Sequence, residues 1–205
     1  MENEAPEAIY ISLNQETNAL DYLEHATVFI RETPKNVKAW KWVVISLHGA
    51  LYGFAVAASC SADSDTSKTK TGKLLGFWET LKKCQDFNHM GMLVNSKHLE
   101  LTDSQKESIE SLKKKLRNEF EHFRPKSWSI EIHGMPQITI NILEVIHFLA
   151  RETCTYVHLS RQEEELVDKL VEETARYIKE TDLYKETILA KKLSQNKEPA
   201  SAQPR

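Results

Sequence analysis

The feature that most constrains this chain is an apolar stretch of twenty residues, VVISLHGALYGFAVAASCSA, which begins at Val43. It is nearly long enough to span a bilayer as a helix, and Trp40 and Trp42 flank it as interfacial aromatic residues do. His48 lies inside the stretch, however, and no second apolar span follows it. A membrane span is therefore the weaker of two interpretations, and a helix buried within a folded domain is the stronger.

Small residues in the same stretch indicate how such a helix would pack. Gly49, Gly53 and Ala57 recur every four residues, a spacing that lets a second helix approach closely. We therefore expect a central, almost wholly buried helix in a soluble protein without a membrane contact.

Hydrophobic periodicity predicts further helices on both sides of the central one. Apolar residues recur at helical spacing, and Gly and Pro number only six each. The sequence thus predicts an all-α bundle of about six helices, at about residues 14–34, 34–60, 73–87, 102–124, 136–158 and 160–193.

The remaining segments are expected to be irregular. Residues 128–133 (WSIEIH) alternate apolar and polar side chains, which favours one short strand or extended link. We expect an N-terminal arm over residues 1–13, a single helical domain over residues 14–194, and a disordered tail over residues 195–205.

Charge and cysteine content narrow the functional classes. A formal net charge of −3 argues against a protein that coats nucleic acid through bulk charge, so any RNA contact must come from a local patch. The three cysteines form no CxxC pair, and the acidic N-terminus shows no secretory signal. We expect reduced thiols in a cytoplasmic protein.

One polar motif stands out, LRNEFEHFRPKSW at residues 116–128. At about 100° per residue, Arg117, Asn118, Glu121 and His122 fall on the side of the predicted helix away from its apolar stripe. Taken alone, the pattern is typical of a solvated helix face with Arg117 and Glu121 as an i,i+4 ion pair. Because the core does not require these side chains, a functional role is the alternative.

The motif resembles the Arg-Asn-x-x-x-His signature of the HEPN superfamily (higher eukaryotes and prokaryotes nucleotide-binding). Arg117, Asn118 and His122 carry the likeness, and LRNEFEHFRPKSWSIEIHGMP resembles stand-alone bacterial HEPN proteins of about this length. Active members are α-helical, metal-independent endoribonucleases, usually homodimers whose two motifs face one composite cleft. The resemblance therefore implies RNA as substrate, a second copy of the chain as partner, and no metal or cofactor.

The residue types suit that chemistry. An imidazole changes charge near neutral pH, so His122 is expected to take a proton from a ribose 2′-OH. The Arg117 guanidinium is expected to grip phosphate oxygens and stabilise the transition state, and Asn118 to orient His122 or hold a phosphate oxygen. The expected substrate-binding residues are Lys114, Glu121, Arg124 and Lys126.

Two departures from the family pattern matter. Glu119 and Glu121 place negative charge beside the expected phosphate site, which weakens RNA binding unless they position the arginine. HEPN toxins that a partner nucleotidyltransferase modifies carry a tyrosine two residues after the histidine. Here that position is Arg124, so this mode of control is not expected.

Three functional classes stay open at this point. The first is a HEPN ribonuclease, as a toxin or antiviral effector, with a protein antitoxin or regulator as a further partner. The second is a HEPN module that binds RNA, nucleotide or a partner protein without cutting. The third is a helical dimerisation module with no ligand.

Other candidate sites rank lower. Glu144 and His147 have the E-x-x-H spacing of helical di-iron sites, but no second E-x-x-H exists. Cys154 and His158 share a predicted helix face, where a buried thiol beside a polar histidine is more typical than zinc. Trp128 is a candidate base-stacking residue, although a tryptophan that opens an apolar alternation usually belongs to the core.

Overall fold

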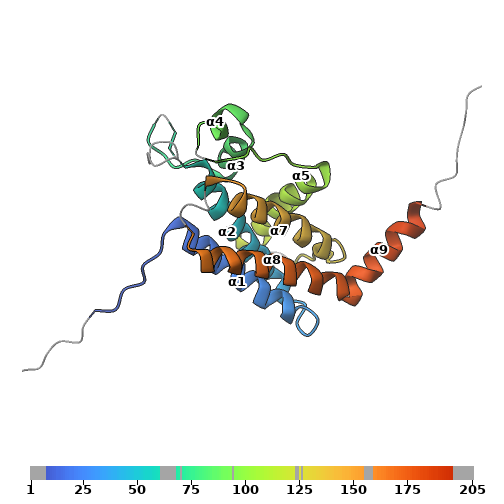
Figure 1. Ribbon diagram of the computed structural model, residues 1–205. Coiled ribbons are helices and arrows are strands. Elements are labelled where there is room, and N and C mark those ends of the chain that lie inside the picture. Colours follow the sequence, from blue (N-terminus) through green and yellow to red (C-terminus); the bar gives the residue numbers. More distant parts are fainter. Residues whose placement is uncertain are drawn as a thin grey trace, which may run out of the picture.

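The computed structural model describes residues 8–60, 68–69, 71–93, 95–122, 125, 127–154 and 159–195, and over these residues the protein is all-α, as predicted. The helices are α1 (Gln15–Glu32), α2 (Ala39–Ser59), α3 (Phe77–Gln85), α4 (Phe87–Gly91), α5 (Asp103–Glu110), the π-helix η2 (Ser111–Arg117), α6 (Asn118–Glu121), α7 (Met135–Arg151), α8 (Arg161–Glu180) and α9 (Asp182–Gln195) (Figure 1). Residues 1–7 and 196–205 of the expected arm and tail lie outside the described residues.

The central helix of the bundle is α2, which packs against α1, α3, η2 and α7. Within the described part of the chain, it is the one helix whose length and hydropathy would allow it to cross a membrane. Two thirds of its most apolar window (67%) is buried inside the fold, and fully buried side chains such as Leu47, Leu51 and Phe54 lie on it. A core helix of a soluble protein has the same length and composition.

The small residues of α2 allow α1 to approach closely. A Cβ built on Gly53 would lie 2.7 Å from Cβ of Ala19, and one built on Gly49 would lie 2.6 Å from Cδ1 of Tyr22. Both distances are shorter than van der Waals contact. The spacing that the sequence shows at these positions therefore serves helix packing within the chain.

Helix starts follow local side-chain chemistry. Thr102 caps α5, because its hydroxyl accepts a hydrogen bond from the backbone N–H of Gln105 (3.2 Å) while the Gln105 side chain accepts from the Thr102 N–H (3.1 Å). Reciprocal pairs of this kind also start α1 at Asn14 and α8 at Ser160. The extended segment before α7 forms no strand in the described residues, and its Ile130 and Ile132 pack against the core.

Two helices end earlier than predicted. The expected fifth helix, to about residue 158, stops at Arg151. The expected sixth is broken at Thr181, whose backbone is extended (φ −67°, ψ 147°) and whose hydroxyl accepts from the N–H of Tyr184 (3.4 Å). Thr181 thereby caps α9, which points away from the body of the bundle (Figure 1). Both halves of the segment are amphipathic, so periodicity alone does not reveal the break.

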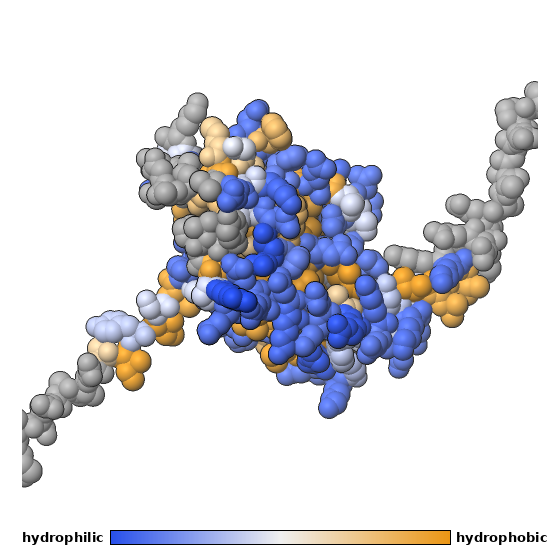
Figure 2. All heavy atoms as spheres, in the orientation of Figure 1, coloured by the Kyte–Doolittle hydropathy of each residue, from blue (hydrophilic) through white to orange (hydrophobic). Residues whose placement is uncertain are grey.

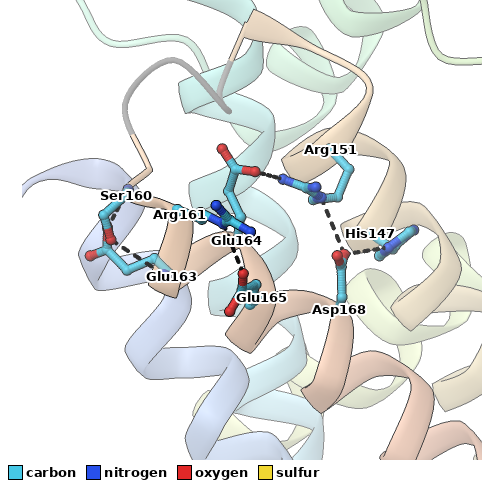
Figure 3. Close-up of polar contacts among 8 residues, drawn as sticks. All are labelled: His147, Arg151, Ser160, Arg161, Glu163, Glu164, Glu165 and Asp168. Carbon is cyan, nitrogen blue, oxygen red and sulfur yellow. Dashed lines mark hydrogen bonds and ion pairs between the residues drawn. The ribbon is translucent and has the colours of Figure 1, made fainter.

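A half-buried ion-pair network joins α7 to α8 (Figure 3). Arg151 pairs with Glu164, and its Nε lies 3.2 Å from Oδ1 of Asp168. The same Asp168 oxygen lies 2.9 Å from Nε2 of His147. Hydrogen bonding to Glu164 is the main cause that raises the pKa of Arg151, with the Asp168 charge acting in the same sense. The network therefore links α7 to α8 in addition to their apolar packing.

Apolar side chains also remain exposed at both ends of the molecule. On the N-terminal arm, Ile9 and Ile11 are almost fully exposed, and on α9 Leu189 and Leu193 are more than half exposed. Figure 2 shows these two regions on opposite sides of a mainly hydrophilic body.

Candidate functional site

The Arg-Asn-x-x-x-His motif begins where a π-helix ends. η2 supplies Arg117, and α6 supplies Asn118 and Glu121. A π-helix forms i→i+5 hydrogen bonds and so holds more residues per turn than an α-helix. Side chains at its end therefore point in directions that an α-helical wheel does not give. Such segments are uncommon, and many lie at functional sites.

Arg117 turns inward at this point. Its side chain is only 24% exposed, pairs with the Glu121 carboxylate, and donates from Nη1 to Oδ1 of Asn118 (3.3 Å). Its Nε is buried and has no hydrogen-bond partner in the described part of the chain. The expectation that Arg117 lies on the solvent side was therefore wrong, because it assumed α-helical register through residues 111–117.

The inward side chains meet α2 at His48. This histidine is 9% exposed, its ring stacks on Phe77 of α3 (centroids 5.0 Å apart), and its Nε2 has no partner among the described residues. Burial is the main cause that lowers the pKa of His48 to about 3, and the charges of Lys113 and Arg117 contribute to the same shift. At neutral pH the imidazole is therefore neutral.

Lys113 belongs to the same group of side chains. Its Nζ lies 5.7 Å from the centroid of the Phe77 ring. Burial lowers the pKa of Lys113 and the Arg117 charge adds to this effect, while Glu121 opposes it. Lys113, Arg117, Glu121 and His48 therefore lie close enough to affect one another's charge.

His122 lies at a different place. It ends α6 with an extended backbone (φ −100°, ψ 105°), and its exposed side chain makes no hydrogen bond or ion pair with any described residue. His122 lines a groove of about 620 Å³ together with Lys38 and Lys41 at the start of α2. No described hydrogen bond joins His122 to the Arg117 or Asn118 side chains within one chain.

Aromatic rings form much of the rest of this groove. Trp128 is 43% exposed and packs against Phe120, with ring centroids 5.4 Å apart and planes 58° apart. Trp128 therefore keeps part of its ring in contact with solvent, rather than lying in the core. Nearby on α2, Lys41 lies over the ring of Trp42 (4.9 Å), which is itself 47% exposed.

Of the four expected substrate-binding residues, the structure describes Lys114 and Glu121, and these two have different partners. Lys114 pairs with Glu110 (2.6 Å), lies over the ring of Trp78 (5.8 Å) and lines a separate pocket of about 370 Å³. Glu121 binds Arg117 rather than facing a groove. Arg124 and Lys126 lie outside the described residues.

Three basic residues near the motif were missed by sequence reasoning. Lys38 and Lys41 carried a usable signal, since VKAWKW alternates lysine with aromatic residues, a pattern found in nucleic-acid-binding surfaces. His48 carried none, because a lone histidine in an apolar helix indicates only a buried polar group.

The weaker metal candidates have other partners. Glu144 accepts a hydrogen bond from Gln105 (3.1 Å), while His147 contacts Asp168. The Cys154 thiol points to the carbonyl oxygen of Ala58 (3.5 Å), and His158 lies outside the described residues. In the part of the chain that the structure describes, no three His, Cys, Asp or Glu side chains cluster as metal ligands.

Comparison with known proteins adds no assignment. No protein-family model, no curated protein and no solved structure matches this chain.

Proposed function

We propose that this protein is a metal-independent endoribonuclease of the HEPN type. The observation that carries the proposal is the His122 groove: an exposed imidazole without a described partner lines the same groove as Lys38, Lys41 and the half-exposed Trp128. Lysines attract the RNA backbone, and an exposed tryptophan stacks on an unpaired base. The groove thus combines a strand-binding surface with a group that moves protons.

The reaction needs only groups that the chain and the substrate provide. His122 takes the proton of a ribose 2′-OH, the 2′-oxygen forms a bond to the adjacent phosphorus, and the bond to the 5′-oxygen breaks. The protonated His122 ring then gives a proton to the departing 5′-oxygen. The products are a 2′,3′-cyclic phosphate and a 5′-hydroxyl, so DNA, which lacks the 2′-OH, is not a substrate.

We propose a homodimer as the active form, because Arg117 and His122 do not face the same place within one chain. Within one chain Arg117 turns toward α2 while His122 faces the groove. In a dimer, the second copy would bring its own Arg117 and His122 to the site. The HEPN resemblance implies a composite cleft of this kind. The exposed apolar side chains on the arm and on α9, such as Ile9 and Leu189, support self-association. Light scattering is expected to give a dimer at micromolar concentration.

The test is cleavage of a defined RNA oligonucleotide in excess EDTA. Replacing His122 by alanine is expected to slow cleavage by about 10²- to 10⁴-fold without loss of helix content. His25, an exposed histidine on α1, supplies the matched control, and His25→Ala is expected to retain the wild-type rate. A 2′-deoxy nucleotide at the scission point is expected to block that cut alone. Wild-type rates for His122→Ala, or loss of activity in EDTA, would contradict the mechanism.

One observation favours a second candidate, a HEPN module that binds RNA without cutting it. The Arg117 guanidinium is engaged by Glu121 and Asn118, which leaves less of it for a transition state. If RNA binds in the groove and no product forms with or without EDTA, this second function replaces the first. Lys41→Ala is expected to weaken binding in either case.

A role as a toxin or antiviral effector, a protein antitoxin or regulator, and a cytoplasmic location stay predictions. A test of the first is growth arrest on expression of the wild-type chain but not of His122→Ala.

A further inference from the structure

His48 and Lys113 both lie against the Phe77 ring, and Arg117 lies close enough for its charge to act on both. His48 comes from α2, and Lys113 and Arg117 come from η2. The His48 ring centroid lies 5.0 Å and the Lys113 Nζ 5.7 Å from the centroid of the Phe77 ring. Lys113 and Arg117 stand four residues apart, so they lie on the same face of η2, which packs against α2.

Not all polar atoms of His48, Lys113 and Arg117 make a hydrogen bond. Nε2 of His48 and Nε of Arg117 are both buried without a partner in the described part of the chain, and His48 is more than nine-tenths buried. A buried polar atom without a partner is destabilising unless something pairs with it. Two such atoms beside the charge of Lys113 indicate a ligand with several acceptor oxygens.

One carboxylate already lies at this position. Glu121 pairs with Arg117, and its charge also acts on Lys113. Glu121 is 33% exposed and stands four residues after Arg117 on the same helical segment. An i,i+4 ion pair within one helical segment contributes only weakly to stability. Glu121 can therefore leave without disturbing the core.

We propose that His48, Lys113 and Arg117 form a phosphate-binding site in which the Glu121 carboxylate acts as an internal substitute until a phosphate group displaces it. A phosphate offers more oxygens than a carboxylate, so it can meet the Arg117 guanidinium, the Lys113 ammonium and His48 together. The neutral His48 ring donates a hydrogen bond when its proton is on Nε2. Because Glu121 competes with any bound anion for Arg117, it lowers the affinity of the site for anions in general.

The phosphate has two conceivable sources, an RNA backbone or a free phosphate. The RNA source rests on the proposed function, because the site would then hold the strand that His122 cuts. The phosphate chemistry itself does not depend on cleavage. Binding is therefore measured separately, and it is expected to persist in His122→Ala.

The experiment is an NMR titration of the folded protein with inorganic phosphate, following the ring ¹⁵N signals of His48. Glu121→Gln is expected to tighten phosphate binding by about three- to tenfold, because it removes the competing charge. Lys113→Met is expected to weaken it by about tenfold. The matched controls are Glu110→Gln, which removes the acid of the neighbouring Glu110–Lys114 pair, and Lys106→Met, which removes an exposed lysine of α5. Both are expected to bind phosphate as the wild type does.

Competition identifies the source of the phosphate. An uncleavable 2′-O-methyl RNA oligonucleotide that displaces inorganic phosphate assigns the site to the RNA backbone, while failure to displace it assigns the site to free phosphate. Unchanged or weaker binding in Glu121→Gln would overturn the proposal, as would equal gains in Glu121→Gln and Glu110→Gln. So would ring signals of His48 that do not move when phosphate saturates the protein. These outcomes are independent of whether RNA is cut.

Discussion

His48 gives the protein a measurable sensitivity to acid. The pKa of His48 is lowered from 6.5 to about 3, first by burial and then by Lys113 and Arg117. Below pH 6.5 the unfolded chain binds a proton at this residue, whereas the folded protein does not until about pH 3. The folded state therefore loses stability as the pH falls through 6.5, and the loss continues down to the folded pKa.

The size of the effect follows from the proton difference. One group contributes about 1.4 kcal/mol per pH unit when only the unfolded state is protonated. Between pH 7 and pH 5, His48 is thus expected to lower the free energy of unfolding by about 2 kcal/mol. A neutral replacement, His48→Gln, removes this contribution, so its stability is expected to depend less on pH by the same amount.

Urea unfolding followed by circular dichroism at pH 7, 6 and 5 measures the difference. The comparison is between slopes against pH, so a uniform loss of stability in His48→Gln does not affect it. His25→Gln, which removes an exposed histidine of α1, controls for the substitution itself. Parallel curves for the wild type and His48→Gln would refute the view that His48 is buried in the neutral form.

Further predictions concern packing and the motif. Gly53→Ala is expected to lower the free energy of unfolding by up to about 2 kcal/mol, because the added methyl meets the backbone of α1 and outweighs the gain of about 1 kcal/mol in helix propensity. Gly49→Ala meets only the Tyr22 ring, which is 37% exposed and can rotate, so urea unfolding is expected to show equal or higher stability. Arg117→Lys is expected to rescue RNA cleavage poorly relative to Arg117→Ala, since lysine lacks the planar fork that holds two phosphate oxygens; single-turnover rates measure this.

Local patterns sufficed for much of the fold. The start of α5 at Thr102 was predictable because a cap depends on residues three positions apart. The break at Thr181 was less visible, since the residues on either side continue an amphipathic pattern. Thr181 and Asp182 are residue types that typically start a helix, and they stand at the start of α9. The apolar spacing continues across them and favoured one unbroken helix instead.

The candidate site was only partly predictable. The motif marked Arg117, Asn118 and His122, yet it did not show that Arg117 and His122 face different surroundings in one chain. The helical wheel assumed one residue spacing throughout, and η2 changes that spacing immediately before the motif. Apolar spacing did not reveal η2, because π-helices are rare and are mostly short insertions within α-helices.

The sequence by itself determined the helical class and the buried role of α2, because both depend on spacings of three and four residues that persist along a helix. Only the tertiary structure decided the surroundings of the motif. The Arg117 charge acts on His48 because α2 packs against η2, and Lys38 and Lys41 line the His122 groove because α2 starts beside it. Such contacts join residues far apart in the chain, and their geometry depends on how whole helices pack rather than on any local pattern.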